Sequence, residues 1–221
     1  MRLRRRARGD MERDRRAGLG GRVGRRPVRR RGRGRGRLVP RPAVPLTTAR
    51  GADGDLQSPD APRLVVASTI APEPIPGEPQ VGQHFWPGVV GDGEPERDSP
   101  TPAPTRDLIG HRFLHRYSPN HLYEHVYLNS ERYCWQCLEG VQRGHGDVDL
   151  TSTYKFDEDL YVFAFREFRI AVASVFFYDM KGLTSTGRFL GLTGDGHAEH
   201  TRSGARIIRL GDVEYPDVQP V

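Results

Sequence analysis

Short apolar and aromatic segments separated by turn residues fill the chain from Arg106 to about Leu192. This pattern, rich in aromatic and β-branched residues, predicts antiparallel strands joined by short connections rather than strand–helix–strand units. Eight strands are predicted, at 111–117, 122–128, 132–139, 152–156, 160–168, 170–179, 184–192 and 205–210. Eight strands can close a small barrel whose interior holds side chains or one ligand. We therefore expect an all-β, up-and-down antiparallel barrel.

The connections are expected to be irregular. The stretch 140–149 contains three glycines and predicts a longer loop, and any helix is expected to be a short turn near Met180 to Leu183.

The predicted strands are apolar on both faces. In strand 122–128, Tyr123, His125 and Tyr127 alternate with Glu124 and Val126. A sheet with one solvated face would show a cleaner polar face. The mixed pattern favours a barrel with an aromatic interior and an outer face that packs against a flap or a second subunit. Alternation alone does not decide which face is the inner one.

Charge divides the chain into two parts. Residues 1–50 hold 19 arginines and three acids, an excess of 16 positive charges, whereas the whole chain carries +6. Residues 51–221 therefore carry a net −10, and the basic character belongs to the N-terminal arm.

We interpret residues 1–50 as a long disordered arm. Its repeated Arg-Gly composition is also typical of a GC-rich gene translated from a wrong start or frame, so an annotation artefact stays open. Non-specific contact with nucleic acid is the third alternative, weakened because the arm lacks interleaved aromatic residues.

A Pro-rich linker is expected over 51–105, because 14 of the 18 prolines lie between Pro40 and Pro104. It holds two apolar islands, at 64–70 and 84–90, and the first leaves room for an edge strand. The folded domain is expected over 106–212, with a tail at 213–221.

Two cysteines, Cys134 and Cys137, do not make a disulfide framework. In a strand they face opposite sides and cannot share a metal ion, so we expect no metal site and no cofactor. No apolar run is long enough to cross a membrane. The sequence predicts a soluble, cytoplasmic protein.

The order of motifs from Leu108 to Gly191 resembles the C-terminal half of the molybdenum cofactor biosynthesis protein F (MoaF) family. The resemblance rests on the run RYSPNHLYEHVYLN, the segment WQCL, the strand LYVFAFRE and the closing STGRFLG. It implies a calycin-like, lipocalin-type barrel and a role close to molybdenum cofactor synthesis. Family members carry an N-terminal half of similar kind, which residues 1–105 do not resemble. No established active-site residues come with the resemblance.

Charged side chains inside apolar strands are usually paired or functional. With the tyrosines and tryptophan of neighbouring strands they are our candidates for a pocket that orients an anionic or phenolic ligand. The candidate ligand-binding residues are Tyr123, Glu124, Tyr127, Trp135, Tyr161, Arg166 and Glu167. The competing interpretation is that Arg166 pairs with an acid of a neighbouring strand on the barrel wall, or that these charges point to solvent.

Three functional hypotheses follow. The first is a MoaF-type domain that binds a small organic molecule in its barrel. The second is a lipocalin-fold lyase or decarboxylase that acts on an aromatic or pterin-like acid, because small barrel decarboxylases use tyrosine, arginine and glutamate in this way. The third is nucleic-acid contact by the arginine arm. Exposed sheet edges in a half-length protein favour a homo-oligomer or pairing with a second calycin half.

Overall fold

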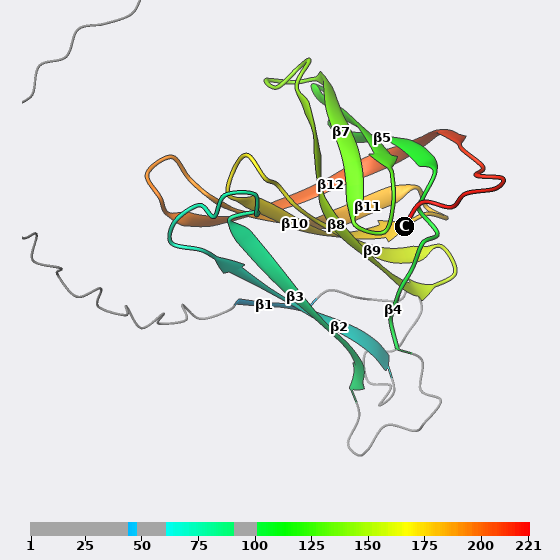
Figure 1. Cartoon of the computed structure of the whole chain (residues 1–221), viewed down its shortest axis with the longest axis horizontal. Coiled ribbons are helices and arrows are strands. Elements are labelled where there is room, and N and C mark those ends of the chain that lie inside the picture. Colours follow the sequence, from blue (N-terminus) through cyan, green and yellow to red (C-terminus); the bar gives the residue numbers. More distant parts are fainter. Residues whose placement is uncertain (1–43, 48–60, 91–100) are drawn as a thin grey trace, which may run out of the picture. The chain divides into compact units, whose positions relative to one another are not determined.

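Eight consecutive strands form a closed barrel in this computed structural model, which describes residues 44–47, 61–90 and 101–221 (Figure 1). The barrel strands are β5 (His111–Ser118), β6 (His121–Tyr127), β7 (Arg132–Glu139), β8 (Gly146–Asp157), β9 (Leu160–Arg166), β10 (Val172–Asp179), β11 (Thr184–Leu192) and β12 (Ala198–Asp212). Each strand pairs antiparallel with the next, and β12 pairs with β5 to close the barrel. The prediction of an up-and-down, eight-stranded barrel is confirmed. The arm was expected over residues 1–50, of which the structure describes only 44–47, so that expectation lies otherwise outside the described residues.

Two connections differ from the prediction. The stretch 140–149 is not all loop, because β8 begins at Gly146, and β12 begins at Ala198 rather than near residue 205. In both places the ladder runs through glycines and charged residues, since backbone pairing with a neighbouring strand outweighs local propensity. Residues 180–183 form a turn and not a helix, and no described residue is helical. The Gly182 N–H donates to Asp179 Oδ1 at 2.7 Å, and Leu183 has a φ of 52°.

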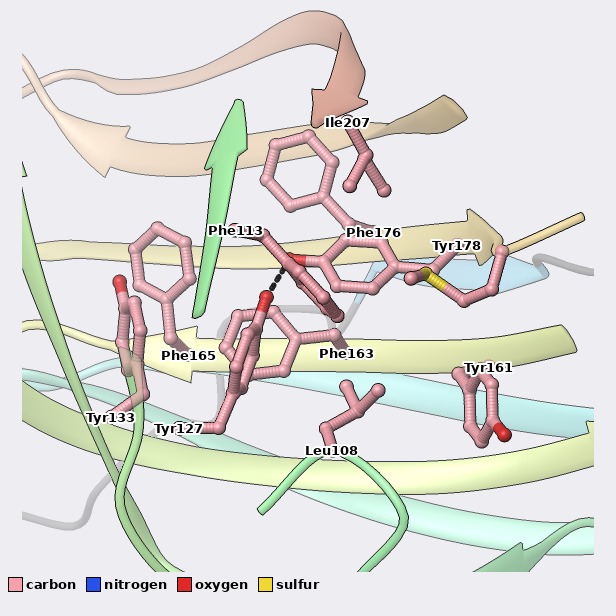
Figure 2. Packing of buried hydrophobic residues seen from close by; sticks show 11 residues of the cluster. Leu108, Phe113, Tyr127, Tyr133, Tyr161, Phe163, Phe165, Phe176, Tyr178 and Ile207 are labelled. Carbon is pink, nitrogen blue, oxygen red and sulfur yellow. Dashed lines mark hydrogen bonds between the residues drawn. The ribbon is translucent and has the colours of Figure 1, made fainter. Parts of the chain in front are cut away.

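Rings from β5, β6, β7, β9 and β10 point into the barrel and fill much of its interior. Figure 2 shows the cluster, with rings meeting edge to face or stacked across the barrel. Phe163 lies centrally, with its ring centroid 5.1–5.3 Å from those of Tyr127, Tyr133 and Tyr178. Large rings suit this position because an eight-stranded barrel has an interior wide enough only for side chains or one small ligand.

A second, three-stranded sheet is made from β1 (Val44–Thr47), β2 (Ala61–Ile70) and β3 (Val81–Val90). β2 and β3 lie within the stretch 51–105 that we expected to be a Pro-rich linker, and β1 lies in the expected arm, 1–50. Leu64 and Val66 of β2 are buried against Val162, Ala164 and Val175, which are outward-facing barrel residues. The hairpin of β2 and β3 thus covers part of the outer barrel face, where the apolar pattern had predicted a flap or a second subunit. The short strand β4 (Ala103–Pro104) adds to β8.

The two cysteines are free thiols on β7, Cys137 buried and Cys134 half-buried. Among the described ranges, histidine, cysteine and acidic side chains form no group suited to a metal ion. The same ranges contain no helix of the length and apolarity needed to span a membrane.

Candidate functional site

A cavity of about 250 Å³ opens at the barrel end where the β5–β6, β7–β8, β9–β10 and β11–β12 connections lie. Its walls come from the inner faces of β5, β6, β7, β11 and β12 and from the residue that follows β9. The lining residues are Tyr117, His121, Tyr123, His125, Tyr133, Trp135, Gln142, Glu167, Phe189 and Ser203. We call this cavity the aromatic pocket. The packed rings beneath it form its floor.

Aromatic rings supply most of the wall. Tyr117 meets Tyr123 edge to face at 5.7 Å between ring centroids, and Tyr123 lies 6.0 Å from Trp135. The Tyr123 hydroxyl donates to Gln142 Oε1 at 2.9 Å, which ties the β7–β8 loop to the wall. Burial raises the pKa of Tyr123 to about 12, so its hydroxyl stays protonated. The rings are therefore held in place before any ligand arrives.

Two carboxyl groups lie close together beside these rings. Asp149 is buried, and its oxygens accept from Trp135 Nε1 at 2.8 Å and from the Phe168 N–H at 3.1 Å. Burial nevertheless raises the pKa of Asp149 above its usual range. Burial, together with the neighbouring Asp149 and Asp147, raises the pKa of Glu167 to about 8. Glu167 is consequently mostly protonated near neutral pH, although it lines the pocket.

The floor of the pocket is polar at one point. His125 stacks on His115 with ring centroids 4.1 Å apart, and each ring has a buried Nδ1 without a protein partner. His115 Nε2 lies 3.4 Å from the Tyr127 hydroxyl, which donates to the Tyr178 hydroxyl at 3.1 Å (Figure 2). Burial lowers the pKa of His115 to about 3 and that of His125 well below its usual value. Both imidazoles are thus neutral at ordinary pH.

The structure brings three of the seven candidate residues together: Tyr123, Trp135 and Glu167 line the pocket. Tyr127 faces the same interior but lies below the pocket, in the core. Tyr161 lies at the other end of the barrel, as Figure 2 shows by its distance from Tyr133. Its hydroxyl donates to Asp107 Oδ2 at 3.1 Å.

Glu124 and Arg166 do not reach the pocket, because neighbouring residues of a strand point to opposite faces. Glu124 lies on the outer wall, where it accepts hydrogen bonds from Arg112 and Gln136. Arg166 borders a separate outer cavity of about 520 Å³ and donates weakly, at 3.4 Å, to Thr151 O and Ser152 Oγ. Glu124 is thus paired with Arg112 on the outside of the barrel.

Several lining residues were not among our candidates. Tyr117, His125 and Tyr133 have the same strand parity as Tyr123 and Trp135, so the sequence did carry a signal for them. Asp149 had no such signal, because its segment was predicted to be a loop.

Comparisons with known proteins agree on the family. The family model described as the MoaF C-terminal domain matches residues 102–213. Protein MoaF of Klebsiella aerogenes is 42% identical over 95 residues, which are 43% of this chain and 36% of that protein. The aligned part thus spans about a third of this relative. A crystal structure of a Burkholderia vietnamiensis protein, provisionally assigned as a beta-lactamase, covers 47% of this chain and 95% of its own at 16% identity and a TM-score of 0.40. That likeness carries no information on activity.

Proposed function

Because the chain belongs to the MoaF family through its C-terminal domain, we propose that its barrel binds a small organic molecule in the aromatic pocket. The observation that carries the proposal is the combination of five rings with one unpaired carboxyl group in an open cavity at the barrel end. Ligand sites are typically apolar concavities with a few polar groups that fix orientation. An ionisable side chain whose pKa is shifted in such a cavity is typical of a functional site.

A role close to molybdenum cofactor biosynthesis is the part of the proposal that rests on the family resemblance. A cytoplasmic location, expected from the sequence, is proposed with it. A pterin ring is flat and carries an amino-substituted edge. Both properties suit a pocket walled by tyrosine and tryptophan and lined by a carboxyl group.

The decarboxylase hypothesis finds less support. Such an enzyme must hold the carboxylate of its substrate, and the arginine that we expected to do so, Arg166, borders the outer cavity instead. None of the ten residues that line the aromatic pocket is lysine or arginine.

Native mass spectrometry of the full chain tests the proposal. We expect a copurifying small molecule on the wild-type protein and its loss in Ser203→Trp, whose new ring would occupy the pocket. Arg202→Trp is the matched control, because Arg202 is exposed on the same strand and neighbouring strand residues point to opposite faces. Retention of the molecule by Ser203→Trp, with loss in Arg202→Trp, would argue against this pocket.

A further inference from the structure

The proposed binding function can be narrowed to one ligand class. Resting on that function, we infer that the aromatic pocket selects a flat ring that carries a cationic or N–H-rich group, with Glu167 as the acceptor for that group. Ligands whose buried part is an acid or a phosphate are expected to bind more weakly.

The first step of the argument is the composition of the wall. Five rings from four strands surround the cavity, and an aromatic face is attractive to a cation or to an N–H group. The positive side chains near this end of the barrel face away from it. Arg188, for example, lies opposite Val175, and Val175 packs on the outer wall. The wall therefore contains no lysine or arginine that would neutralise an anion.

The second step concerns the acidic groups. Glu167 lines the cavity, and no described side chain pairs with it. Asp149 lies behind the Trp135 ring with both oxygens already bonded, which leaves Glu167 as the free acceptor. An anionic ligand would add a third negative group to this site, whereas an amidine-like or amino-heterocyclic edge would supply the missing N–H donors. Such charge-assisted bonds are about twice as strong as neutral ones.

The third step is a coupling to pH. The titratable groups around Glu167 are Asp147 and Asp149 of β8, Tyr123 and Tyr133 on β6 and β7, and the lining histidines His121 and His125; none of them is lysine or arginine. In the empty pocket the pKa of Glu167 is about 8. A bound cation favours the carboxylate, so binding must release a proton wherever the pH is below that value.

Three molecules of the same shape test the inference: benzamidine, benzamide and benzoate carry a positive, a neutral and a negative group on one ring. The chain has two tryptophans, and Trp86 is exposed on β3. In a Trp86→Phe background, Trp135 in the pocket wall is the only tryptophan, and its fluorescence reports binding. We expect benzamidine to bind at least about tenfold more tightly than benzoate, with benzamide in between. A pterin is titrated in parallel. Its affinity shows how a neutral aminopyrimidinone edge compares with the positive group of benzamidine.

The pH profile identifies the acceptor. Affinity for benzamidine is expected to rise by up to about tenfold per pH unit from about pH 6 and to level off above about pH 8. Glu167→Gln should lower the affinity and flatten the profile, whereas Glu158→Gln, an exposed glutamate at the β8–β9 turn, should change neither. Benzoate binding as tightly as benzamidine, or an unchanged profile in Glu167→Gln, overturns the inference and leaves the pocket as a binding site. Failure of all four molecules to bind, together with no copurified ligand, overturns the proposed function as well.

Discussion

At the scale of single residues, Glu167 makes the protein less stable as the pH rises. Its pKa is about 8 in the folded chain, against a usual value of 4.5. The folded state therefore binds this proton more tightly than the unfolded state, and the stabilisation present below pH 4.5 is lost as the pH rises through 8. We expect Glu167→Gln to gain of order 4 kcal/mol over wild type at pH 8 and little at pH 4.5, measured by urea unfolding. Glu158→Gln should show no such pH-dependent gain.

The buried pair of His115 and His125 makes the protein less stable as the pH falls, the opposite of the effect of Glu167. A histidine whose folded pKa is about 3 must be neutral, whereas the unfolded chain protonates it below about 6.5. Stability is therefore present above pH 6.5 and is lost as the pH falls towards 3. We expect His115→Phe to weaken the acid-induced loss by about 2 kcal/mol at pH 5, because one unfolded-state protonation is removed. His145→Phe, at an exposed turn, is the control. An unchanged acid profile in His115→Phe would contradict the assignment of this residue as the acid-sensitive group.

Strand parity made part of the pocket predictable from single residues. Tyr123 and Trp135 were candidates. Because residues two apart in a strand lie on the same face, His125 and Tyr133 could also have been predicted as pocket residues. What the sequence could not settle was which face is inner, since Glu124 and Arg166 also sit in strongly apolar strands. That choice depends on closure of the whole barrel, which puts the ring-bearing face inside.

At the scale of elements, close contact between β10 and β11 explains the glycine of the STGRFLG motif. A Cβ on Gly187 would lie 2.2 Å from Val175 O and 2.7 Å from the Phe176 ring. Neither backbone nor buried ring can withdraw, so Gly187→Ala should destabilise the barrel by about 2 kcal/mol or more in thermal or urea unfolding. Gly194→Ala is the matched control, because its Cβ would meet nothing within 4 Å. Equal stability of the two variants would contradict the tight β10–β11 contact.

Element existence was easier to predict than element boundaries. Aromatic strands such as β6 and β9 are evident from composition and alternation. The hairpin of β2 and β3 was not predicted as a pair, although the island at 64–70 left room for an edge strand, because prolines argue against strands. Pro62 lies near the start of β2, and Pro87 lies in β3, a strand at the edge of its sheet. Prolines are tolerated in both places, since no ladder hydrogen bond need be lost.

At the scale of the whole molecule, the barrel has no open edge of its own. Each of its strands pairs on both sides, so residues 101–221 should fold without the preceding chain. The truncation would, however, uncover Val162, Ala164 and Val175, which the hairpin covers in the full chain. We expect circular dichroism to show a β-rich fold for 101–221, and size-exclusion chromatography with light scattering to show more self-association than for the full chain. An unfolded or strictly monomeric fragment would contradict this account.

The pairing of β12 with β5 has a consequence for engineering. Asp212 lies opposite His111, so the last residue of β12 lies beside the first residue of β5. A short glycine-rich bridge between these positions, with new ends cut in the exposed 194–196 turn, should give a circular permutant with the same strand neighbours. For the same reason, partner domains fused before or after the barrel would project from one common point on its rim.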